Sequence, residues 1–318
     1  MDRIDIANIQ DIAYSGEEKI DSMYDILIFN NIKKEFDQFD TVTRNLFLMQ
    51  RNAKSAYEYA ICIIHCWYWD ESFTNHRNFI FNQFRTAACT DPYYGCLYAI
   101  NIDECYHELT YKSACREPKT AFLYAYYILK HSTNESRRSA CRDPYCAYCY
   151  ALEIDNCPRD DTRKAACRNS GCAYYYAKDI DKEPRRDTRK VACKEPNTAY
   201  WYAKSVDKCS RKDTRRAVYK DPEYAYFYAK DVDREPRDDT RKAACKSPDF
   251  AYLYALNIDK CSRDDTRKAV CGDSKYALAY ARDVDKGLHE DTWKAIKNTE
   301  YEEEYKKIFN ELLKEQLI

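Results

Sequence analysis

The chain alternates short apolar stripes with charged stretches, and the alternation returns at a fixed interval. Residues 220–259 contain nearly the same segment twice, 26 residues apart. Apolar positions at i, i+3, i+4 and i+7 form one face of an α-helix. In the first half of this segment those positions hold Ala225, Tyr228, Ala229 and Val232. The pattern therefore predicts an amphipathic helix that recurs every 26 residues.

Two ladders of residues at this interval show how far the repeat extends. The first ladder consists of cysteines, with one tyrosine in the missing place: Cys89, Cys115, Cys141, Cys167, Cys193, Tyr219, Cys245 and Cys271. The second consists of Tyr98, Tyr124, Tyr150, Tyr176, Tyr202, Tyr228, Tyr254 and Tyr280. Eight copies without an insertion indicate a repeat architecture, in which each copy buries its apolar face against its neighbours.

Start signals divide each copy into two short helices. An acceptor side chain followed by proline, as in Asp91-Pro92, Asp143-Pro144 or Asp221-Pro222, favours the start of the second helix. For the first helix, proline or serine at one shared position suggests the N-terminus, and the helix would end near Lys194 or Lys246. The residues at that shared position are Pro158, Pro184, Ser210, Pro236 and Ser262.

These patterns predict an all-α fold, an α-solenoid of about eight 26-residue helical hairpins. We place the array at residues 81–290. Residues 1–80 would form an irregular helical N-terminal cap with one degenerate repeat. Residues 291–318 would form a C-terminal capping helix, because terminal repeats need a polar outer face.

The amino-acid composition argues against several classes of function, among them phosphate-backbone binding and dinucleotide binding. The 318 residues are 45% hydrophobic and 33% charged, which suits an ordered core, and 52 basic against 53 acidic residues leave a net charge of −1. A protein that chiefly grips phosphate backbones usually has a basic excess. The five glycines lie far apart, so no dinucleotide fingerprint or phosphate-cradling loop exists. No segment suits a signal peptide or a membrane span, and we expect a soluble, cytoplasmic protein without a membrane partner.

The second helix also resembles a known type of repeat. Its sequence "DPEYAYFYAKDVD" is similar to tandem "DPxxAYxYAxDVD" α-helical repeats in uncharacterised proteins of tailed bacteriophages and large DNA viruses. The resemblance covers about residues 81–290 and implies a helical array of viral or mobile-element origin, which acts in the host-cell cytoplasm if the protein is viral. It carries over no catalytic residue. The first helix, "DDTRKAAC", departs from the phage versions.

The cysteine and histidine residues give little indication of a disulfide or a metal site. Packed helices lie roughly 9–10 Å apart, whereas a disulfide needs Cα atoms within about 7 Å, so neighbouring rungs of the cysteine ladder should not bridge. Cys62, His65, Cys66 and His76 form the one mixed cluster with zinc-like spacing. The first three of these equally suit one face of a short helix. We expect neither a metal nor a cofactor.

An arginine ladder and the aromatic residues of the second helices are the candidate binding groups. The arginines Arg163, Arg189 and Arg241 alternate with aspartates along the array, which suits either an ion-pair network between copies or a binding groove. The aromatic candidates are Tyr174, Tyr175, Tyr200, Trp201, Tyr226, Phe227 and Tyr252. Arginine and tyrosine are favoured anchors at protein interfaces.

We therefore expect a non-enzymatic scaffold that binds a protein partner, such as a viral protein acting on a host or defence component. Carboxylates recur in every copy, whereas a catalytic site is rarely copied. One alternative is a nucleic-acid or nucleotide-binding array that uses the Tyr/Arg faces, and another is a virion structural protein. A continuous basic stripe would favour nucleic acid, and mixed charge with exposed aromatic side chains would favour protein.

Overall fold

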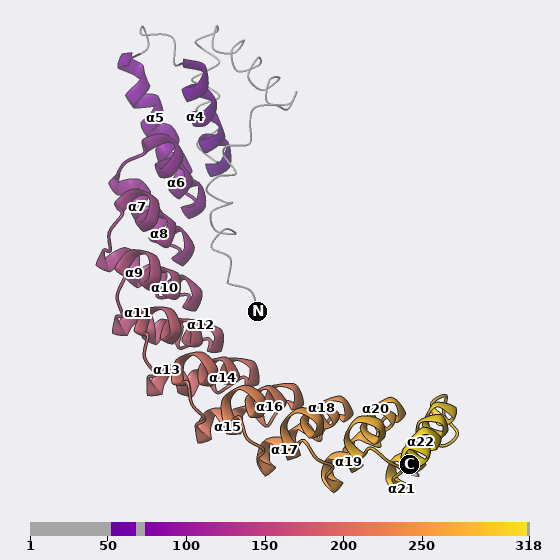
Figure 1. Cartoon of the computed structure of the whole chain (residues 1–318). Coiled ribbons are helices and arrows are strands. Elements are labelled where there is room, and N and C mark those ends of the chain that lie inside the picture. The colour runs from indigo at the N-terminus through magenta and orange to yellow at the C-terminus, as the bar shows by residue number, and fades with distance from the viewer. Residues whose placement is uncertain (1–51, 68–73, 317–318) are drawn as a thin grey trace. The chain divides into compact units, whose positions relative to one another are not determined.

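The computed structural model describes residues 52–67 and 74–316. These residues form helices joined by short turns and contain no β-strand. The chain divides into two compact units, residues 1–165 and 166–318. Within each unit the helices form two rows, a row of first helices and a row of second helices, as Figure 1 shows. The predicted all-α solenoid is confirmed.

In the first unit two longer helices precede the regular copies. Each second helix begins as an α-helix and continues as a π-helical segment (η), in which the hydrogen bonds span five residues. The helices in chain order are α4 (Ala53–Trp67), α5 (Thr74–Ala88), α6 (Pro92–Tyr98), η2 (Ala99–Asp103), α7 (Glu108–Ala114), α8 (Pro118–Tyr124), η3 (Ala125–Leu129), α9 (Asn134–Ala140), α10 (Pro144–Tyr150), η4 (Ala151–Asp155) and α11 (Asp160–Ala166), whose last residue begins the second unit.

The second unit repeats this arrangement and closes with a longer helix. Its helices are α12 (Ser170–Tyr175), η5 (Tyr176–Asp181), α13 (Arg186–Ala192), α14 (Pro196–Tyr202), η6 (Ala203–Asp207), α15 (Lys212–Val218), α16 (Pro222–Tyr228), η7 (Ala229–Asp233), α17 (Asp238–Ala244), α18 (Pro248–Tyr254), η8 (Ala255–Asp259), α19 (Asp264–Val270), α20 (Ser274–Tyr280), η9 (Ala281–Asp285), α21 (Glu290–Ile296) and α22 (Glu302–Gln316).

The second helices begin where the sequence predicts, but the acceptor side chain caps only some of them. Glu117, Glu195 and Ser247 precede proline and make no capping hydrogen bond. Asp221 has extended backbone angles and accepts hydrogen bonds from the backbone N–H groups of Glu223 and Tyr224. Asp91 and Asp143 cap their helices in the same way. Proline follows each of these aspartates at the first helical position, where no N–H is needed. The helix ends at Asp233, as the sequence predicts, although its second half is π-helical.

The first helices begin one residue later than predicted. In α13, α15, α17 and α19 the N-cap is the arginine after the proline or serine, as at Arg185 and Arg211, and its side chain makes no capping hydrogen bond. A buried tyrosine of the same copy supplies the cap instead. The Tyr228 hydroxyl accepts from the backbone N–H of Arg211 at 3.1 Å and also lies 2.8 Å from the hydroxyl of Thr214.

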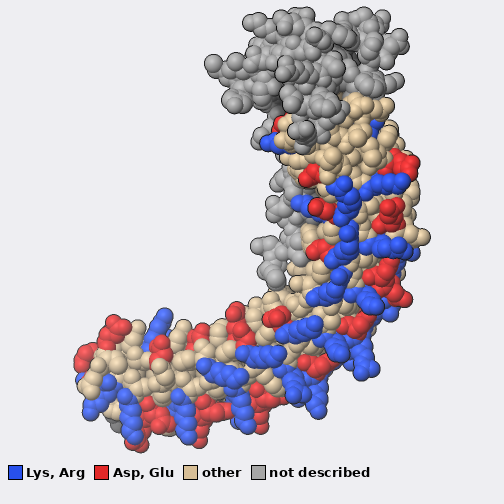
Figure 2. Space-filling model, turned by 180° about the vertical axis from the view of Figure 1, so that it is seen from behind, with Lys and Arg blue, Asp and Glu red and all other residues tan. Residues whose placement is uncertain are grey.

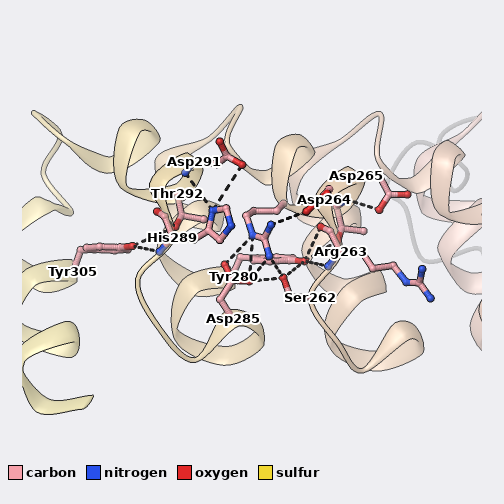
Figure 3. Close-up of polar contacts among 12 residues, drawn as sticks. Ser262, Arg263, Asp264, Asp265, Tyr280, Asp285, His289, Asp291, Thr292 and Tyr305 are labelled. Carbon is pink, nitrogen blue, oxygen red and sulfur yellow. Dashed lines mark hydrogen bonds and ion pairs between the residues drawn. The ribbon is translucent and has the colours of Figure 1, made fainter. Parts of the chain in front are cut away.

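This tyrosine clamp recurs along the array and forms its core. The ladder tyrosines are fully buried, and the alanines beside them, such as Ala225 and Ala229, are also inaccessible to solvent. Figure 3 shows the clamp twice, at Tyr280 and at Tyr305. Small residues let the helices approach closely, and the tyrosine rings fill the space that remains.

Tyr305 extends the clamp into the C-terminal cap. It lies on α22, one residue before the place that the 26-residue interval assigns to a ladder tyrosine. Its hydroxyl accepts from the backbone N–H of His289 at 3.3 Å and lies 3.2 Å from the hydroxyl of Thr292. The sequence pattern missed this residue because the interval changes at the cap.

Candidate binding surfaces

The aromatic candidates lie on what we call the second-helix face, formed by the second helices and their π-helical segments. Tyr174, Tyr200 and Tyr226 are buried, and Tyr252 is half-buried. Three of the hydroxyls reach the π-helical segment of the next copy: Tyr200 donates to Asp231, Tyr226 accepts from Asn257, and Tyr252 donates to Asp283 at 2.7 Å. These tyrosines therefore join successive copies.

The aromatic residues that follow them are half-buried. The ring centroids of Tyr174 and Tyr175 are 4.9 Å apart, and those of Tyr200 and Trp201 are 5.0 Å apart. Phe227 packs against Tyr226 in its own copy and against Tyr200 in the preceding copy, with centroids 5.3 and 6.0 Å apart. The rings thus present only part of their surface to solvent.

Lysines cover these rings. Lys178, Lys204 and Lys230 place their ammonium groups 5.2–5.8 Å from the centroids of Tyr174, Tyr200 and Tyr226. The Lys204 ammonium also lies 2.7 Å from the carboxylate of Asp231. The second-helix face therefore carries mixed charge over aromatic rings, and cation–π contacts hold the lysine side chains in place.

The candidate arginines project from the first helices into ion pairs. Arg241 is buried and pairs with Asp238 in its own helix, with Asp259 at 3.1 Å and with Asp265 of the next copy at 2.9 Å. Arg189 pairs with Asp207 at 2.8 Å. Arg163 is buried and pairs with Asp160 at 2.8 Å.

Burial and ion pairing act in opposite directions on the aspartates of this network. Burial raises the pKa of Asp259 above its ordinary value, and the charges of Arg241 and Arg263 oppose that shift. Burial also acts to raise the pKa of Asp265, but the hydrogen bond and charge of Arg241 outweigh it and lower the pKa. The arrangement matches the predicted ion-pair network between copies.

The exposed basic residues of the first helices were missed in the sequence analysis. One position after the arginine ladder, every copy carries an exposed lysine or arginine, and we call this row the basic row. It consists of Lys112, Arg138, Lys164, Lys190, Arg216, Lys242, Lys268 and Lys294. The signal was present in the sequence as an unbroken 26-residue ladder. Figure 2 shows Lys and Arg side chains in rows over the array, with Asp and Glu beside them.

A second basic ladder lies four residues further on, in the turns that follow α7, α9, α11, α13, α15 and α17, whereas the last two copies have Gly272 and Asn298 in this place. Arg116 donates to the backbone carbonyls of Cys89 and Thr90, and Arg142 donates to that of Cys115 at 2.9 Å. Lys246 donates to the carbonyl of Tyr219 at 2.7 Å. These residues tie the end of one first helix to the end of the preceding one, where unpaired carbonyls favour a cation.

The weak metal candidate, Cys62, His65, Cys66 and His76, falls on helices α4 and α5, and the side chains of these four residues are not among those that the structure describes. Among the side chains that it does describe, no three metal-ligating groups come together. The described cysteines form no disulfide, and burial raises the pKa of Cys193 and Cys245 to about 12.

Comparison with family models, curated proteins and solved structures finds no match to this chain. The resemblance to phage and viral repeats therefore stays a prediction, as do the predicted location and the boundaries at residues 80 and 290. Within the described ranges no helix is both long and apolar enough to cross a membrane.

Proposed function

We propose that this protein is a non-catalytic scaffold that binds a protein partner along the basic row of its first helices. The supporting observation is the mixed charge of that face. On five of the eight first helices that carry the row, namely α7, α11, α17, α19 and α21, an acidic residue lies one turn before the basic residue. It forms an ion pair with the row at Lys112–Glu108 (2.5 Å) and Lys294–Glu290 (2.6 Å).

A surface of alternating charge is more complementary to a protein partner than to a partner of uniform negative charge such as a nucleic acid. A nucleic-acid backbone laid along the row would meet a carboxylate in most copies, at Glu108, Asp160, Asp238, Asp264 and Glu290. A protein surface can match both signs, and charge complementarity of this kind fixes register and raises the association rate. The half-buried rings of the second-helix face offer the same partner apolar contacts.

The proposal is tested by affinity capture from a lysate, with and without nuclease, followed by mass spectrometry. The full-length protein is compared with a row variant, Lys164→Glu/Lys242→Glu/Lys268→Glu. The matched control, Lys182→Glu/Lys208→Glu/Lys260→Glu, makes the same charge change at exposed turn residues. Thermal unfolding of both variants confirms that they fold.

We expect one protein to be captured by the wild type and the control, resistant to nuclease, and reduced about tenfold by the row variant. Capture that collapses with nuclease would support the nucleic-acid alternative instead. Equal capture by the row variant would contradict the proposed face.

A further inference from the structure

An open groove of about 790 Å³ lies on the first helices of the second unit, at α13 and α15. Five basic residues line it, namely Arg189, Arg211, Lys212, Arg216 and Lys220, against a single acidic residue, Asp213. No aromatic side chain lines it. The mixed charge of the other first helices is thus replaced here by an excess of positive charge.

The excess comes from a break in the repeat. The first position of α11, α17, α19 and α21 is acidic, but in α13 and α15 that position holds Arg186 and Lys212. Residues 185–194 and 211–220 therefore each contain five basic residues and one acidic residue. The corresponding segments 159–168 and 237–246 each contain four and two.

Loss of the acidic residue also changes the arginine ladder. Where the acid is present it pairs with the arginine three residues later, and the side chains of Arg163, Arg241 and Arg267 are 6–10% exposed. In α13 and α15 that pair is missing, and the side chains of Arg189 and Arg215 are 13% and 18% exposed. The guanidinium groups of these two copies are more accessible.

Six exposed cations on the two helices that border the groove, and on the turns after them, make no ion pair with any residue that the structure describes. On α13 and the turn after it they are Arg186, Lys190 and Lys194, and on α15 and the turn after it they are Lys212, Arg216 and Lys220, which line the groove itself. Successive packed helices lie roughly 9–10 Å apart, so these cations are gathered in a small area. Their mutual repulsion is relieved by a ligand that brings several negative charges close together.

We propose that this groove binds clustered phosphate groups carried by a multiply phosphorylated segment of the protein partner. Each phosphate carries about −1.5 to −2 charges at neutral pH and accepts paired hydrogen bonds from arginine, so a few phosphates match six cations. A nucleic acid would find no ring in the groove on which to stack its bases. The inference rests on the proposed function and names the chemistry of one part of the same face.

The decisive variant restores the residues that other copies carry. Arg186→Asp/Lys212→Asp returns both positions to the acidic residue of α11, α17 and α19, so the fold is expected to be kept. The matched control, Lys182→Asp/Lys208→Asp, makes the same charge change at exposed turn residues. Fluorescence anisotropy with the full-length protein measures binding of a synthetic peptide with three neighbouring phosphoserines. The comparison probes are the unphosphorylated peptide, inorganic polyphosphate and an oligouridylate.

We expect the phosphopeptide to bind the wild type and the control equally, and the Arg186→Asp/Lys212→Asp variant at least about tenfold more weakly. The unphosphorylated peptide should not bind. Unchanged phosphopeptide affinity in that variant would overturn the inference. Groove-dependent binding of polyphosphate alone would replace the partner segment with a free ligand, and tighter binding of oligouridylate would replace it with nucleic acid.

The two proposals fail in different ways. If the Arg186→Asp/Lys212→Asp variant still captures the partner as well as the wild type does, the groove is not the phosphate site and the scaffold proposal stands. If neither the wild type nor the control captures a nuclease-resistant protein, the proposed function itself is wrong.

Discussion

At the scale of single residues, the tyrosine clamp explains why the tyrosine ladder has no gap. The hydroxyl is shared between the N-cap backbone of a first helix and a threonine or serine hydroxyl at Tyr124, Tyr150, Tyr202, Tyr228, Tyr254 and Tyr280. At the start of the array the Tyr98 hydroxyl instead donates to the carbonyl of Phe81 inside α5. A buried donor or acceptor left without its partner costs more than the hydrogen bond itself contributes. The hydroxyl is therefore as much a part of the core as the ring.

The clamp predicts a loss of stability from removal of a single oxygen. Tyr228→Phe should lower the free energy of unfolding by about 1–3 kcal/mol, because the N–H of Arg211 and the hydroxyl of Thr214 lose a buried partner. Chemical denaturation measures the change. Tyr224→Phe is the control: Tyr224, in the same copy, packs its ring against that of Tyr200. A loss as large in the control as in Tyr228→Phe would contradict the clamp.

At the scale of elements, each second helix changes from α to π after its ladder tyrosine. A π-turn brings residues five apart onto one side of the helix, so Asp233 comes to the same side as Tyr228. There the Asp233 carboxylate lies 3.8 Å from the Arg215 guanidinium of the first helix. The helix then ends at Arg234 with φ of 57°, in the left-handed region.

These left-handed ends predict that glycine is stabilising where a lysine now stands. A residue with a Cβ costs about 1–2 kcal/mol in this region, and glycine does not. Lys260, with φ of 53°, is one such residue. Lys260→Gly should raise the free energy of unfolding by about 0.5–1 kcal/mol, measured by chemical denaturation.

The control for this change is an exposed lysine inside a helix. Lys268→Gly in α19 should lower the free energy of unfolding by about 1 kcal/mol, because glycine is a poor helix former. The opposite sign of the two substitutions is the test. Destabilisation by both would mean that the left-handed ends are not strained.

At the scale of the whole molecule, stability is distributed along the array, because the main packing contacts among the described helices join a copy to its neighbours. The array should therefore tolerate loss of one complete copy. Deletion of residues 238–263 joins Arg237 to Asp264 and keeps the register of every ladder. We expect a folded protein with unchanged helicity per residue, and a denaturant m-value lower by roughly a tenth.

Loss of half a copy should have a different effect. Deletion of residues 238–250 removes α17 and the start of α18. Tyr254, on the part of α18 that remains, then has no first helix to cap. We expect loss of cooperative unfolding, measured by circular dichroism in denaturant. A cooperative transition in this variant would show that the copies do not stack as one-dimensional neighbours.

The sequence by itself determined the helical repeat, its 26-residue interval, the starts of the second helices and the buried tyrosines and alanines. All of these follow from local rules: apolar spacing, acceptor–proline pairs and identity between copies. The sequence did not decide whether the arginines form ion pairs or bind a partner. The structure decides this for Arg241, because folding places Asp238, Asp259 and Asp265 around its guanidinium group.

Tertiary structure alone decided which charges face the solvent. The arginine ladder and the basic row are adjacent in the sequence and look alike there, yet the first is largely enclosed and the second is exposed. The N-caps of the first helices and the role of Tyr305 also depend on groups 13 to 17 residues away in the chain. Burial and hydrogen bonding of these groups are set by packing between helices, which no local pattern contains.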